Sequence, residues 1–147
     1  MTGFTIARTA VKLAMFAWWT HVESNHIRTK FGLNDDPRVM AGVAAIIEHA
    51  AFRIGMKEDR GRALVRATNE ACREALPKLN GHHPLLQMIC QDYDDRIEIT
   101  LESPGGVRSA TEAFVAMLKK QVDRVTAETH GGALHLTLVE YIRAENR

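Results

Sequence analysis

The stretch Asp59–Lys78, DRGRALVRATNEACREALPK, predicts one amphipathic helix on which the rest of the chain packs. Small and apolar residues recur in it at three- and four-residue spacing, which places them on one side of a 3.6-residue helix. They are Leu64, Ala67, Ala71, Cys72, Ala75 and Leu79. The other side carries charges four residues apart, at Arg62, Arg66, Glu70, Glu74 and Lys78. Pro77 marks the end of the helix.

Length and composition indicate a single globular domain. The chain has 147 residues, a quarter of them charged, and a net charge of +1. This balance offers no basic run for a nucleic acid, so we expect no nucleic-acid partner. Cys72 and Cys90 both fall in apolar stretches. Two such cysteines indicate buried thiols in a reducing compartment, and we expect a cytoplasmic protein.

The N-terminal stretch from Phe4 to Trp19 is apolar but is interrupted by Arg8 and Lys12. A membrane-spanning helix needs roughly 20 apolar residues, so we expect no membrane association. The spacing of the apolar residues predicts an amphipathic helix instead. We therefore divide the chain into an N-terminal helical extension, residues 1–24, and one domain, residues 25–147. The apolar face of the extension would complete the core of its own domain or form a homodimer with a second copy.

The remaining elements follow in order. Alternation predicts a strand over His26–Leu33, and Asp36-Pro37 starts a helix that runs to about Ile54 and ends at Gly55. Tyr93-Asp94-Asp95 joins two strands, residues 85–90 and 96–101, into an antiparallel hairpin. Ser109 and Glu112 form a capping box for a helix to about Glu128, Gly131-Gly132 breaks it, and residues 133–142 form a last strand.

This order predicts an α+β fold. Its simplest arrangement is a two-layer sandwich, in which helices cover one face of a mixed or antiparallel sheet of about four strands. The N-terminal helix is an addition to it. Ile47, Ala71, Ile99 and Leu136 should be buried between the layers.

With these residues, the order of elements resembles the histidine-kinase-like ATPase superfamily, specifically its branch of bacterial anti-sigma factor serine kinases. The resemblance covers roughly residues 26–142. In the family, a strand leads into Asp-Pro and a long helix, as at Asp36-Pro37. A second helix carries Glu-Ala-x-x-Asn-Ala, which residues 70–75, EACREA, match except at the fifth position. A hairpin then ends in Asp-x-Gly-x-Gly, where this chain has residues 102–106, ESPGG.

The resemblance implies a nucleotide site formed by Glu70, Glu74, Glu102, Gly105 and Gly106. Glu70 occupies the position of the general base in active members of the family. Glu74 replaces the asparagine that binds magnesium, and Glu102 replaces the aspartate that accepts a hydrogen bond from adenine. Pro104 replaces the first loop glycine and lacks a backbone N–H.

The predicted helix from Ser109 occupies the place of the second phosphate loop and its lid. A continuous helix offers no free N–H groups to phosphates. We therefore interpret the nucleotide site as vestigial, with no cofactor; ATP and magnesium would bind only if the site survives.

Two other interpretations of these residues stay open. Glu70 and Glu74 fit a solvated charged face, because Arg66 and Lys78 lie one turn before and after them. His49 lies on a predicted helix beside its apolar stripe, as a phosphotransfer histidine would. No Cys/His cluster at ligand spacing and no HxxxH pair occurs, so we expect no metal site.

The sequence therefore predicts a regulatory protein, an anti-sigma-type domain that binds a protein partner and does not hydrolyse ATP. The resemblance implies a sigma factor, an anti-sigma antagonist or a response-regulator module as the partner. One alternative is an active ATP-dependent serine kinase that uses Glu70. The other alternative is a histidine phosphotransfer protein that uses His49.

Overall fold

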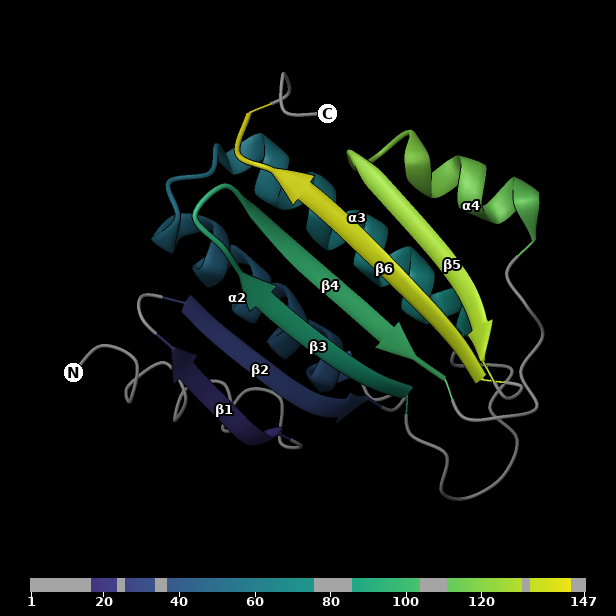
Figure 1. Cartoon of the computed structure of the whole chain (residues 1–147), viewed down its shortest axis with the longest axis horizontal. Helices are drawn as coiled ribbons and strands as arrows, with labels where there is room; N and C mark the ends of the chain where they lie inside the picture. The colour runs from purple at the N-terminus through teal and green to yellow at the C-terminus, as the bar shows by residue number, and fades with distance from the viewer. Residues whose placement is uncertain are drawn as a thin grey trace.

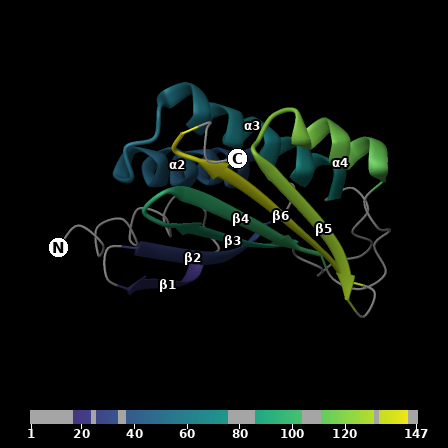
Figure 2. The same ribbon diagram turned by 45° about the horizontal axis from the view of Figure 1, so that its top comes forward.

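A computed structural model describes residues 17–23, 26–33, 37–75, 86–103, 111–130 and 133–143. They form two layers, a sheet of six strands and a layer of three helices on one of its faces (Figures 1 and 2). The strand order is β1-β2-β3-β4-β6-β5, and every neighbouring pair is antiparallel. The α+β two-layer prediction is confirmed. The described sheet is larger than the predicted four strands and has no parallel pair.

The helices of the described chain are α2 (Pro37–Arg53), α3 (Glu58–Ala75) and α4 (Glu112–Lys119). The strands are β1 (Ala17–Glu23), β2 (His26–Leu33), β3 (Leu86–Asp92), β4 (Arg96–Glu102), β5 (Arg124–His130) and β6 (Ala133–Tyr141). The first two helices of the domain and the predicted strands 26–33, 85–90, 96–101 and 133–142 are confirmed over their described residues. Residues 76–78 and 85, at the predicted ends of α3 and β3, lie outside the described part. None of the described helices is both long enough and apolar enough to span a membrane.

The N-terminal extension is not helical where the structure describes it. Residues 17–23 form β1, which pairs with β2 from Ala17 opposite Phe31 to Glu23 opposite His26. The prediction of a helical extension is therefore wrong for these residues, and residues 1–16 lie outside the described part. Aromatic and β-branched side chains in AWWTHVE favour a strand once β2 offers a free edge.

The predicted helix from Ser109 to about Glu128 is confirmed over Glu112–Lys119 and is wrong beyond it. Helix α4 ends at Lys119, and Arg124–His130 is β5, paired with β6. The N-cap is Thr111, whose Oγ1 accepts a hydrogen bond from the N–H of Phe114 at 3.2 Å. Ser109 lies outside the described residues. Val122 and Val125 are three apart, which fits a helix, but antiparallel pairing with the next strand, β6, decides the conformation here.

The core lies between the sheet and the helices. Ile47, Ala71, Ile99 and Leu136 are each at most 3% exposed, as predicted. Both cysteines are buried and free, and burial raises the pKa of each thiol to about 12. Gly55, at φ +76°, follows the end of α2, and Gly61 of α3 lies against α2, where a Cβ would be 3.2 Å from Cβ of Ala51, closer than ordinary packing.

The second hairpin strand, β4, has two unlike faces. Ile97, Ile99 and Leu101 are buried and belong to the core, whereas Glu98 and Thr100 alternate with them. Successive side chains of a strand point to opposite faces. The residues that alternate with the core positions of β4 therefore lie on the face of the sheet that the described helices leave uncovered, which we call the open face.

Candidate functional site

Glu70 lies on α3 at the contact with the segment that follows α4. Its Oε2 accepts a hydrogen bond from Nε2 of Gln121 at 2.9 Å, and the side chain is half-buried. The carboxylate therefore joins α3 to the α4–β5 turn. Glu74, one turn later on the same helix, is exposed. The structure does not bring Glu74 into the Glu70–Gln121 contact.

Glu102, the last residue of β4, lies on the open face, in the phase of Glu98 and Thr100. Its Oε1 is 3.7 Å from Nδ1 of His135 on β6. The helix α3 covers the other face of the sheet, so the structure does not bring Glu102 and Glu70 together. The alternation of apolar and polar residues along β4, which is visible in the sequence, already indicates that Glu102 lies on the open face.

Ser103 takes the phase of Ile99 and Leu101 and is 3% exposed. Its backbone N–H donates to the carbonyl oxygen of Leu134 at 3.0 Å, and its Oγ accepts from the N–H of Leu134 at 3.2 Å. The last buried position in this phase, directly after β4, is therefore occupied by a serine hydroxyl and not by a carboxylate. Gly105 and Gly106, like Pro104, lie outside the described residues.

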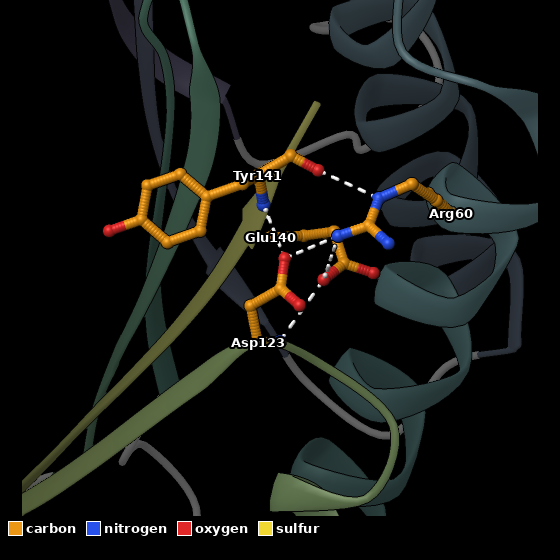
Figure 3. A network of polar contacts seen from close by, with 4 residues as sticks. All are labelled: Arg60, Asp123, Glu140 and Tyr141. Carbon is orange, nitrogen blue, oxygen red and sulfur yellow. Dashed lines mark hydrogen bonds and ion pairs between the residues drawn. The ribbon is translucent and has the colours of Figure 1, made fainter. Parts of the chain in front are cut away.

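A cluster of charged side chains at the other end of α3 was not foreseen from the sequence (Figure 3). Arg60, near the start of α3, donates from Nε to the carbonyl oxygen of Tyr141 at 2.8 Å. The same guanidinium binds the carboxylate of Asp123 and lies 3.3 Å from Oε1 of Glu140. Backbone N–H groups complete the set: that of Asp123 donates to Glu140 at 3.1 Å, and that of Tyr141 donates to Asp123 at 2.9 Å. We call these four residues the Arg60 cluster.

The Arg60 cluster holds two carboxyl groups almost out of solvent. The side chains of Asp123 and Glu140 are 1% and 4% exposed. Burial, a hydrogen bond with Asp123 and the charge of Asp123 raise the pKa of Glu140 to about 8. Burial acts to raise the pKa of Asp123 as well, but its hydrogen bonds with Glu140 and Tyr141 and the charge of Arg60 outweigh burial and lower it. Near neutral pH Glu140 therefore holds a proton and Asp123 is ionised.

A signal for this cluster exists in the sequence. One phase of β6 contains the apolar residues Leu134, Leu136 and Leu138, followed by Glu140. Glu140 therefore occupies a position at which the alternation predicts a core residue. A carboxyl group in that phase requires a buried partner. The partner, Arg60, is 80 residues away, and the sequence does not identify it.

The cluster borders a cleft of about 340 Å³ between α3 and the α4–β5 turn. Arg66, Lys119, Lys120 and Gln121 line it together with members of the cluster. Gln121 also bonds Glu70, so the cleft and the Glu70 contact lie beside the same turn. The arrangement fixes α3 against the turn.

His49 is exposed on α2. Among the residues that the structure describes, no group of three or more histidine, cysteine, aspartate or glutamate side chains could hold a metal ion.

Comparisons with known proteins identify a similar fold. No family model and no curated protein matches the sequence. A crystal structure of the RsbU and RsbW domains of Rv1364c from Mycobacterium tuberculosis matches with a TM-score of 0.61 at 14% identity. The match covers 77% of this chain and 31% of that chain. At this identity the match shows a shared fold alone.

Proposed function

We propose that the chain is a bacterial regulatory protein of the anti-sigma type. In this proposal it binds a protein partner in the cytoplasm through an ATPase-like domain that does not hydrolyse ATP. The observation that carries the proposal is the face of the sheet on which the side chains at the end of β4 lie. The carboxylate that would replace the adenine-binding aspartate, Glu102, lies on the open face, and Ser103 occupies the buried phase in its place.

One further observation supports a vestigial nucleotide site: Glu74 carries a negative charge where the family has an asparagine. A carboxylate beside a triphosphate adds repulsion to a site that already holds several charges. The expectation of a long helix in place of the second phosphate loop no longer supports the proposal, because α4 ends at Lys119.

The anti-sigma part of the proposal rests on two similarities. The sequence motifs resemble anti-sigma factor kinases, and the fold matches a structure that contains an RsbW domain. The partner is accordingly a sigma factor, an anti-sigma antagonist or a response-regulator module. Isothermal titration of the purified protein with one member of each class from the same organism tests this. The proposal fails if none of the three binds.

Nucleotide binding is tested by thermal denaturation with Mg-ATP and with Mg-ADP. We expect no change in Tm, because Glu74 and Glu102 replace the residues that bind magnesium and adenine in the family. A ligand at 100 times its Kd would add about 2.7 kcal/mol to the free energy of unfolding, so binding would be visible. A rise in Tm that Glu74→Ala removes would contradict the vestigial site.

The second candidate is an active serine kinase, favoured by the half-buried position of Glu70 beside the α4–β5 turn. ATP and magnesium would then be the cofactors. This candidate requires transfer of labelled γ-phosphate to a serine of the partner. Glu70→Gln would abolish the transfer, and the exposed pair Glu58 and Arg62 offers a matched control in Glu58→Gln.

The third candidate, histidine phosphotransfer, is favoured by the exposure of His49. It predicts an acid-labile phosphate after incubation with a small phosphodonor. His49→Ala would remove the label and His135→Ala would retain it. An unlabelled wild-type protein excludes this candidate.

A further inference from the structure

The strand β5 forms one outer edge of the sheet (Figure 1). It pairs with β6 on one side, and no strand of the described chain pairs with its other side. Helix α4 lies with α2 and α3 on the helix side of the sheet (Figure 2). Thr126, Ala127, Glu128 and Thr129 are all exposed. An edge of this kind presents backbone donors and acceptors to any strand that approaches it.

Backbone hydrogen bonds at the two ends of the β4–β6 pair fix which residues of β5 point their backbone groups outward. The N–H of Ser103 donates to the carbonyl oxygen of Leu134, and the N–H of Ile142 donates to that of Asp95, so the even-numbered residues of β6 pair with β4. The odd-numbered residues of β6 therefore pair with β5. Their partners are even-numbered, as in Thr126 opposite Thr137 and Glu128 opposite His135. The N–H and C=O groups of Val125, Ala127 and Thr129 consequently point away from the sheet.

The charges on the edge are arranged symmetrically about Thr126. Arg124 lies two residues before it and Glu128 two residues after it, and both line the same hollow on the open face. The guanidinium of Arg124 lies over the ring of Tyr141, 5.9 Å from its centroid, on that face. Two copies of β5 that pair antiparallel about Thr126 place Arg124 of each copy opposite Glu128 of the other.

This register also gives hydrogen-bond partners to the outward backbone N–H and C=O groups of β5. It sets Val125 opposite Ala127 of the partner subunit, and both residues have outward backbone groups, so they form hydrogen-bonded pairs. Arg124 and Glu128 of the partner subunit then form a non-hydrogen-bonded pair, in which side chains approach more closely. A shift that centres the pairing on Glu128 sets two glutamates against each other. Parallel pairing sets Arg124 against Arg124 of the partner subunit.

We propose that β5 pairs with β5 of a second copy of this chain, about a two-fold axis at Thr126, to form one continuous antiparallel sheet across a homodimer. Charged residues on an edge strand usually prevent pairing between copies. Here the order of the two charges makes the edge complementary to itself, so the same residues select a single register. The proposal is independent of the nucleotide site and of the proposed partner.

A charge exchange tests the proposal. In Arg124→Glu the paired positions are all acidic, and in Glu128→Arg they are all basic, so each variant alone should sediment as a monomer. An equimolar mixture of the two should form a heterodimer, and the double variant R124E/E128R should dimerise as the wild type does. Higher salt should weaken the wild-type dimer, because its ion pairs are exposed.

Two further variants separate loss of pairing from loss of folding. Ala127→Pro removes an N–H that points away from β6, so the fold should remain by circular dichroism and the dimer should be lost. Glu48→Arg, an equal charge change on the exposed side of α2, should leave the dimer intact. A wild-type monomer throughout the micromolar range overturns the proposal. So does a dimer that persists in both single variants, because it must then use another surface, such as the N-terminal residues 1–16.

Discussion

The backbone N–H of Asp123 donates a hydrogen bond to Oε1 of Glu140 at 3.1 Å, which places two buried carboxyl groups side by side next to Arg60. Asp123 precedes β5, Glu140 lies near the end of β6, and Arg60 lies near the start of α3. The contact therefore fixes the helix layer to the sheet at a point where neither layer is apolar. The stability of this contact depends on the charge of Arg60 and on the proton of Glu140, and a substitution can test each.

Arg60→Ala should destabilise the fold by about 3 kcal/mol. Removal of one partner from a buried ion pair costs about 3–5 kcal/mol, and protonation of Glu140 relieves part of the remaining charge. Urea unfolding at pH 7 measures the change. Arg62→Ala is the matched control on the same helix, because Arg62 forms an ion pair with Glu58 in which both side chains are largely exposed. We expect it to cost less than about 1 kcal/mol. Equal losses in the two variants would show that the Arg60 cluster adds no stability.

The stability of the wild type should fall as the pH rises from about 5 to 8. The pKa of Glu140 is raised in the folded state from 4.5 to about 8, so the folded state holds a proton that the unfolded state releases. Its contribution is complete below pH 4.5 and is lost through pH 8, at no more than about 1.4 kcal/mol per pH unit. The lowered pKa of Asp123 acts in the opposite sense, but only at more acidic pH, near and below its ordinary value of 3.8.

Glu140→Gln isolates this effect, because the amide mimics the protonated carboxyl at every pH. The difference in free energy of unfolding between the variant and the wild type should therefore grow in favour of the variant as the pH rises. Histidines titrate in both proteins and cancel in the difference. Glu112→Gln on the exposed start of α4 should track the wild type. A constant difference between Glu140→Gln and the wild type would contradict the raised pKa.

Asp92→Ala should cost about 3 kcal/mol. Asp92 is 1% exposed, and its Oδ1 accepts the N–H of Ile27 at 2.9 Å while its Oδ2 lies 3.4 Å from Nε of Arg53. Loss of the carboxylate leaves the buried N–H of Ile27 without this acceptor and removes a counter-charge. Asp94→Ala, two residues along the same hairpin, removes a side chain that is 93% exposed and should change the free energy of unfolding by less than about 0.5 kcal/mol.

Ile99→Ala should cost about 2–5 kcal/mol, because the side chain is fully buried between β4 and the helices. Thr100→Ala changes the next residue, on the open face, and should cost less than about 1 kcal/mol. Chemical denaturation of the two variants compares the faces of one strand directly. Similar costs would mean that the two faces of β4 are equally buried.

The sequence alone predicted the elements whose signals are local. Asp36-Pro37 and Gly55 mark both ends of α2, and the spacing of small residues from Leu64 to Ala75 identifies α3 and its buried side. The turn at Tyr93 and the alternation that follows it identify the β3–β4 hairpin. In each case the residues that determine the element lie within it or beside it, so no knowledge of distant contacts is needed.

Tertiary structure alone decided the Arg60 cluster, and pairing with the next strand decided β5. The segment 124–130 carries residues that suit a helix or a strand, and the hydrogen bonds that make it a strand come from β6. Arg60 is separated from Asp123 by 63 residues and from Glu140 by 80, so no local pattern joins them. A charged side chain becomes buried only where the fold supplies its counter-charge, and that supply depends on how the layers pack.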